Sequence, residues 1–223
     1  MRNLVILVAL IFLALGATGF GSFRSKISQL PDGTMSGKTY SNDALGLRYE
    51  APTGWIATAD PKGPVSLDYR EPDGSANQCS KVLLSLHAPQ QAEGRFNSMA
   101  TLFAIDPACF SGAKFPKSLE DKNKIQKFAD KIVKAFSNTP YISRNGADVD
   151  AVRATGRLII ILTGEEVIDA VESRDQATKE QLHVNTLFCL AESNGYWVAW
   201  TALADDSSRA EMKNSNVQFK VAP

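Results

Sequence analysis

The chain has 223 residues, and its 24 lysines and arginines balance its 24 aspartates and glutamates, so the formal net charge is zero. Hydrophobic residues make up 44% and charged residues 22%, a balance that excludes disordered, collagen-like, coiled-coil and multi-span membrane proteins. A zero net charge also argues against a nucleic-acid partner, because binding a phosphate backbone needs a surplus of lysine and arginine.

Residues 1–20 have the order of a secretory signal: a charged start at Arg2, an unbroken apolar run over residues 4–15, and small residues from Gly16 to Gly19. The apolar run is short for a helix that crosses a bilayer, which favours a cleaved signal peptide. A retained anchor over residues 4–20 is the alternative. Either interpretation predicts an exported protein, periplasmic or extracellular.

Residues 21–37 are polar, rich in glycine and serine, and show little periodicity. They are predicted to be a flexible linker. The rest of the chain, residues 38–223, is predicted to be a single domain, since it is long enough to bury one sizeable core.

Strand patterns dominate this predicted domain. Alternating or apolar runs mark strands at residues 45–50, 65–70, 81–86, 99–105, 158–162, 182–190, 196–203 and 217–221. The Asn-Gly pairs at 145–146 and 194–195 predict tight hairpin turns, because both residues of such a turn need positive φ. The run at 158–162 is apolar at every position, which predicts a central strand covered on both faces.

One long helix is clear from its amphipathic stripe, formed by Ile125, Phe128, Ala129, Ile132, Val133 and Phe136. Pro116, Ser118 and Asp121 predict its start, and Asn138 with Pro140 predict its end. A shorter helix is expected over residues 206–213. The predicted class is α+β, with a mainly antiparallel sheet and helices packed on its faces.

Three cysteines allow one disulfide, and Cys79–Cys109 is the predicted pair. Cys79 comes just before the strand at 81–86, and Cys109 just after the strand at 99–105. If these strands are antiparallel neighbours, the start of one meets the end of the other. Cys189 lies within a strand among apolar residues and is predicted to stay a reduced, buried thiol.

Several short motifs together resemble the Mog1/PsbP-like family. They are Lys38-Thr-Tyr-Ser, Leu45-Gly-Leu-Arg-Tyr, Pro52-Thr-Gly-Trp55, Gly195-Tyr196 and the terminal Val217-Gln-Phe-Lys. The resemblance covers roughly residues 38–221 and is greatest to secreted bacterial members. It implies a curved antiparallel sheet sandwiched between helices. Named members of the family are binding proteins, of the photosynthetic oxygen-evolving complex or of a small nuclear GTPase, but their binding residues match no positions here.

Catalytic and metal-binding patterns are sparse. His87 and His183 are the only histidines, and no spacing typical of a metal site, a phosphate loop or a nucleophile motif occurs. His183 and Cys189 share a strand face but are separated by about 20 Å, too far for a nucleophile–base pair. No cofactor is predicted.

Two sets of residues are candidates for contact with a partner or ligand. Lys124, Lys127, Lys131 and Lys134 lie on the helix face opposite the apolar stripe and form a possible contact surface. Such a row is also the ordinary composition of a solvated helix face. Trp55, Trp197 and Trp200 are candidates for ligand stacking, but core packing is favoured, because Trp197 and Trp200 point to opposite faces of their strand.

The sequence predicts an exported, non-enzymatic binding or accessory module of the cell envelope. Its partner is expected to be another envelope protein or the membrane surface. The alternative is a hydrolase-like envelope enzyme, whose site would be assembled from distant residues such as a histidine with a Cys, Ser or Asp.

Overall fold

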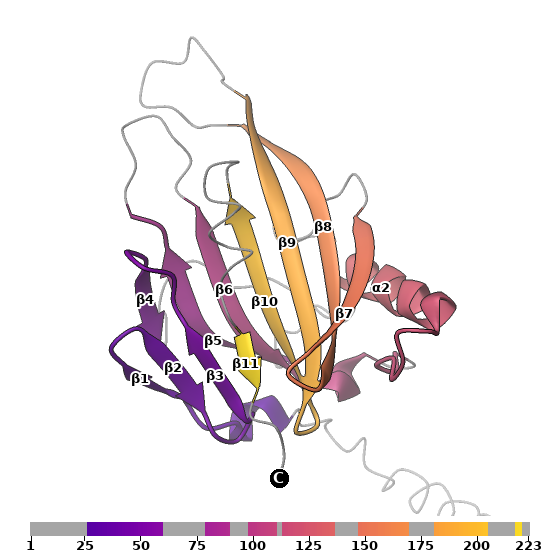
Figure 1. Ribbon diagram of the computed structural model, residues 1–223, viewed down its shortest axis with the longest axis horizontal. Coiled ribbons are helices and arrows are strands. Elements are labelled where there is room, and N and C mark those ends of the chain that lie inside the picture. The colour runs from indigo at the N-terminus through magenta and orange to yellow at the C-terminus, as the bar shows by residue number, and fades with distance from the viewer. Residues whose placement is uncertain are drawn as a thin grey trace, which may run out of the picture.

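The computed structural model describes residues 26–59, 79–89, 98–110, 113–136, 147–169, 181–204 and 217–219 (Figure 1). Its elements in chain order are η1 (Lys26–Gln29), β1 (Thr34–Ser36), β2 (Thr39–Asn42), β3 (Leu47–Glu50), β4 (Ile56–Ala59), β5 (Ser80–His87), β6 (Met99–Ile105), η2 (Pro107–Cys109), α2 (Lys122–Phe136), β7 (Asp148–Ala154), β8 (Arg157–Asp169), β9 (Gln181–Ser193), β10 (Tyr196–Ala204) and β11 (Val217–Phe219).

A seven-stranded antiparallel sheet in the order β4-β5-β6-β10-β9-β8-β7 forms the centre of the molecule. Its hairpin β9–β10 turns at Asn194 and Gly195, whose φ angles are 49° and 79°, so the predicted Asn-Gly turn is confirmed. A turn of the same kind joins β7 to β8 at Thr155 and Gly156, with φ of 48° and 78°. Both turns lie at the lower end of the sheet in Figure 1.

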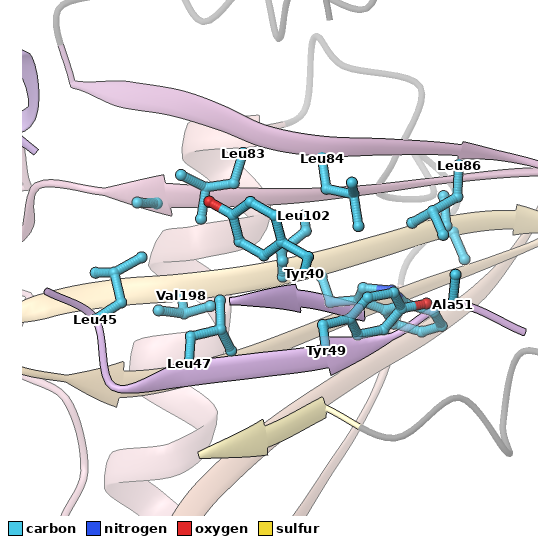
Figure 2. Close-up of a cluster of buried hydrophobic side chains, with 14 of the residues drawn as sticks. Tyr40, Leu45, Leu47, Tyr49, Ala51, Leu83, Leu84, Leu86, Leu102 and Val198 are labelled. Atoms are coloured by element: carbon cyan, nitrogen blue, oxygen red, sulfur yellow. The ribbon is translucent and has the colours of Figure 1, made fainter. Parts of the chain in front are cut away.

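A second antiparallel sheet, in the order β1-β2-β3-β11, covers one face of the large sheet. Figure 2 shows its tyrosines and leucines directed towards strands β5, β6 and β10. We call the apolar contact between the two sheets the sheet–sheet cluster. Its members include Tyr40, Leu45, Leu47, Tyr49, Trp55, Leu84, Leu86, Leu102, Val198 and Trp200.

Helix α2 lies against the opposite face, beside β7 and β8. It begins after Asp121, whose carboxylate accepts a hydrogen bond from the Lys124 backbone N–H at 3.2 Å, as expected for a helix cap. Its buried stripe packs into a second cluster, which we call the aromatic cluster. Its buried members include Phe103, Phe128, Ile132, Phe136, Ile160, Leu162, Phe188 and Trp197.

The α+β class and the mainly antiparallel sheet are therefore confirmed, but the layers differ from the prediction. Among the described residues, a helix covers one face of the large sheet and a small sheet covers the other, where helices were expected on both faces. The apolar run at 158–162 lies in β8, next to the edge strand β7. Leu158, Ile160 and Leu162 are buried while Ile159 and Ile161 are half-buried, so this strand is covered on one face and only partly on the other.

The segment from residue 26 to 36 belongs to the folded unit, which corrects the predicted linker of residues 21–37 over that stretch. Ile27 of η1 and Leu30, which follows η1, are both buried in the sheet–sheet cluster, and η1 contacts β5. The Lys26 backbone N–H donates to Asp106 at 2.8 Å, and the Lys26 ammonium lies 4.5 Å from the centre of the Tyr196 ring and donates to the Gly195 carbonyl. Two apolar side chains and one lysine thus hold this segment at the lower end of the sheet.

Several predictions fall on residues that lie outside the described ranges. They are the signal segment 1–20, the start of the linker at 21–25, the strand at 65–70, the turn at Asn145-Gly146 and the short helix at 206–213.

Candidate contact surface

The disulfide Cys79–Cys109 is present, with the two Cα atoms 5.9 Å apart, and Cys189 is free. It forms where it was predicted because β5 and β6 are antiparallel neighbours, with Ser80 opposite Ile105. The backbone N–H of Asp106 also donates to the Cys79 carbonyl at 2.8 Å, so the ladder continues up to the disulfide. The bridge ties the start of β5 to η2.

The four lysines of the predicted contact surface, Lys124, Lys127, Lys131 and Lys134, are all exposed on α2. They face away from the sheet because the stripe that contains Ile125, Phe128 and Ile132 is buried. Lys124 forms an ion pair with Asp121, and its hydrogen bond is the main cause that lowers the pKa of that carboxyl. The structure therefore presents this lysine row to solvent as predicted, with one lysine already neutralised by its own helix cap.

A groove of about 220 Å³ with several cationic side chains lies on the same side of the sheet as α2. We call it the basic groove. It runs between the segment that leads into α2 and the lower ends of β7, β8 and β9, and it is lined by Phe115, Pro116, Lys117, Arg153, Arg157, Leu158 and Glu192. Three cationic side chains thus meet one carboxylate around an apolar floor.

Backbone carbonyls hold both arginines of the groove. Arg157 donates to the Glu192 carbonyl at 2.8 Å. Arg153 donates to the Gly156 carbonyl at 3.3 Å and to the Lys117 carbonyl at 3.4 Å. These bonds fix the two guanidinium groups on either side of the β7–β8 turn, and the bond to Lys117 connects that turn to the segment before α2.

The basic groove has no clear signal in the sequence. Arg153 and Arg157 flank the Thr155-Gly156 turn, and two arginines around a turn are a weak local signal. Lys117 is 36 residues from Arg153, and Glu192 is 35 residues from Arg157. Only the pairing of β8 with β9 and the packing of α2 bring these residues together.

The two histidines lie far apart on opposite faces of the large sheet. His87 is on β5 opposite Met99, which packs towards the aromatic cluster. His183 is exposed on β9, one position before Val184 of the same cluster, and so points to the other face. Strands β6 and β10 lie between them, which puts the two strands about 14 Å apart. Within the described ranges, no three His, Cys, Asp or Glu side chains gather to hold a metal ion.

Cys189 lies on β9 between Ile161 of β8 and Trp200 of β10, where it packs partly buried against the sheet–sheet cluster. Burial raises the pKa of the Cys189 thiol to about 12. The thiolate is the nucleophilic form of cysteine, so a thiol held this far towards its protonated form is poorly suited to nucleophilic catalysis near neutral pH.

All three tryptophans are buried. Trp197 packs in the aromatic cluster, while Trp55 and Trp200 pack in the sheet–sheet cluster. The opposite orientation of Trp197 and Trp200 follows from their opposite parity along β10, as predicted. Their rings form parts of the two cores and do not line a ligand surface.

No family model matches the chain, and no curated protein matches it. Among solved structures, the chain is similar to the solution structure of cyanobacterial PsbP (CyanoP) from Synechocystis sp. PCC 6803, with 13% sequence identity and a TM-score of 0.42 over 90% of this chain and 92% of that one. Among the described residues, no helix is both long and apolar enough to cross a membrane.

Proposed function

We propose that this chain is an exported, non-enzymatic binding module of the cell envelope, and that its partner contacts the side of the molecule that carries α2. One observation carries the proposal. Helix α2 buries all of its apolar stripe except the half-buried Val133 and leaves four lysines exposed, on the same side of the sheet as a groove lined by three more cationic side chains.

Export is supported by two independent features. The order of charge, apolar run and small residues over residues 1–20 is typical of a secretory signal. The Cys79–Cys109 disulfide is typical of an oxidising compartment such as the periplasm or the cell exterior.

A binding role is supported over catalysis by the chemistry of the described residues. The histidines point to opposite faces of the sheet, and the Cys189 thiol is held protonated. The formal net charge of the chain is zero, so long-range steering by total charge is weak. Recognition would therefore depend on a local patch, and the side that carries α2 supplies one.

The proposal is tested by crosslinking the native chain in its own envelope and identifying the captured partner. The charge-reversed variant Lys127→Glu/Lys131→Glu is expected to lose capture in a salt-dependent way. It should still fold, because exposed lysines contribute little to stability. The matched control is Lys38→Glu in the turn between β1 and β2, an exposed lysine beside the small sheet whose ammonium pairs with Glu50.

Two results would count against parts of the proposal. Unchanged capture by the helix variant removes the lysine row from the contact. A substrate turned over by the purified chain, with activity lost in His87→Ala or His183→Ala, overturns the non-enzymatic role itself.

A further inference from the structure

We propose that the basic groove binds a short acidic peptide segment of the partner protein. A carboxylate of that segment would be held by Arg153, Arg157 and Lys117, and an adjacent apolar side chain would rest on Phe115 and Leu158. This inference rests on the proposed binding function and names the chemistry that its surface recognises.

The arginines are prepared for a carboxylate before any ligand arrives. Backbone carbonyls already hold each guanidinium, so less side-chain freedom is lost on binding. Arg153 uses two of its donors in this way, and a guanidinium carries five. The planar fork of donors matches the two oxygens of a carboxylate, which a lysine alone does not.

The floor of the groove is apolar and packs against the core of the molecule. Leu158 is buried, and the Phe115 ring lies 5.2 Å from the Phe128 ring and 6.5 Å from the Trp197 ring, measured between centroids. Phe115 therefore packs against the aromatic cluster, which supports this part of the floor. A volume of about 220 Å³ is below the roughly 300–1,000 Å³ of enclosed small-molecule sites, so the groove fits a side chain or two better than a whole metabolite.

The charge of the groove favours isolated carboxylates. Three cationic side chains against the Glu192 carboxylate leave a formal charge of +2. This is enough for one or two carboxylates and too little for a dense polyanion such as a nucleic acid. A recess with an apolar floor also suits a protruding peptide better than the flat plane of lipid headgroups, which would contact the exposed lysines of α2 first.

The test uses the full chain and a short, terminally blocked peptide whose glutamates alternate with leucine and phenylalanine. The same peptide with glutamine in place of glutamate is the ligand control. We expect the acidic peptide to bind about tenfold more tightly by titration calorimetry, with chemical shift changes centred on β7, β8 and the segment before α2.

Variants of the chain locate the site. Arg153→Gln/Arg157→Gln is expected to weaken binding of the acidic peptide by about tenfold or more. Lys38→Gln/Arg48→Gln removes the same charge from exposed positions in or next to the small sheet, away from the groove and from α2, and should change binding by less than about threefold. Glu192→Gln has the opposite sign and should tighten binding by about two- to fivefold, because it removes a like charge from the groove.

If the double arginine variant is unstable, Lys117→Gln and Glu192→Gln serve in its place, since both side chains are exposed at the rim of the groove. Equal affinity for the two peptides overturns the inference, as does a double arginine variant that binds like the native chain. Binding of phosphatidylglycerol vesicles that is lost in the arginine variant, without peptide binding, also overturns it. The proposed function is judged separately, by capture of a partner in the envelope, so the two proposals can fail independently.

Discussion

The two faces of the large sheet are packed with different kinds of side chain. The sheet–sheet cluster buries seven alanines, namely Ala51, Ala88, Ala100, Ala104, Ala191, Ala202 and Ala204. The aromatic cluster buries five aromatic rings, namely Phe103, Phe128, Phe136, Phe188 and Trp197. Strands β6 and β10 contribute to both clusters, so neighbouring residues of one strand take part in two different packing arrangements.

The difference follows from what covers each face. Two packed sheets lie about 10 Å apart, so small residues on one sheet make room for large residues such as Tyr40 and Tyr49 on the other. A helix on a twisted sheet leaves wider gaps, which large rings fill. The sheet–sheet cluster should therefore be sensitive to added volume, and the aromatic cluster to lost volume.

The largest effect is expected from removing a ring of the aromatic cluster. Phe103 is fully buried, with its ring 6.3 Å from that of Phe136 and 6.0 Å from that of Phe188. Phe103→Ala should lower the free energy of unfolding by about 3–5 kcal/mol, measured by denaturant titration. Its neighbour Leu102, buried on the other face, is the matched position. A loss at Phe103 clearly smaller than the loss in Leu102→Ala would contradict the comparison.

Removal of the disulfide should have the second-largest effect on stability. Its cysteines are 30 residues apart, and a loop of this size corresponds to about 3–4 kcal/mol of stability. Cys79→Ala/Cys109→Ala is expected to lose this amount and to loosen the adjacent Phe110, whose ring is 5.3 Å from that of Trp197. During denaturant titration of this variant, the fluorescence of Trp197 should change at a lower denaturant concentration than that of Trp200. The two signals are separated by using variants that keep only one of these two tryptophans. Cys189→Ala is the control, because it leaves the bridge intact.

Adding volume to the sheet–sheet cluster should have a smaller effect. Ala202 is 1% exposed on β10, and Ala202→Leu is expected to lower the free energy of unfolding by about 1–3 kcal/mol through overpacking. Ala154→Leu, at the partly exposed end of edge strand β7, should change it by less than about 0.5 kcal/mol. If Ala202→Leu proves neutral, the alanines are not what allows the two sheets to approach.

The effect that is smallest at neutral pH concerns the pH dependence of Cys189. The pKa of its thiol rises from an ordinary 9.0 to about 12 on folding, so the unfolded chain loses this proton first as pH rises. The free energy of unfolding should therefore fall between about pH 9 and 12 and be unaffected by this group below pH 9. The difference between the native chain and Cys189→Ala in the slope of unfolding free energy against pH gives the contribution of the thiol alone. A Cys189→Ala curve parallel to that of the native chain would contradict the shift.

Labelling of the native thiol gives a second measurement. Below pH 9, a shift of this size leaves roughly a thousandfold less thiolate than in an exposed cysteine. Reaction with a disulfide reagent should be slow in the folded chain and become fast on unfolding.

Elements with local signals could be predicted from the sequence. The hairpin β9–β10 depends on one Asn-Gly pair, and β6 coincides with the apolar run at 99–105. The disulfide could be placed because it needs only two consecutive strands to pair antiparallel. In each case the contacting residues are close in sequence or joined by one connection.

Elements that depend on pairing between residues far apart in the chain could not be predicted from the sequence. The small sheet pairs β3 with β11, so that Leu47 lies opposite Phe219, and no local pattern announces that contact. The burial of Ile27 was hidden for the same reason, because its partners lie on later strands. The basic groove combines both difficulties, since its residues come from the segment before α2 and from three strands.

The contacts of Lys26 would determine the orientation of the domain relative to a membrane. If residues 4–20 stay in the bilayer, six peptide units separate residue 20 from Lys26, and they reach at most about 20 Å. Lys26 is held at the end of the sheet where the β7–β8 and β9–β10 turns lie, so the basic groove would face the headgroup layer at short range. Strands β8 and β9, each 13 residues long, would then project their far ends about 40 Å outwards. A tether this short would keep the groove close to the bilayer surface. The groove would then bind only those acidic segments that a partner presents near the membrane.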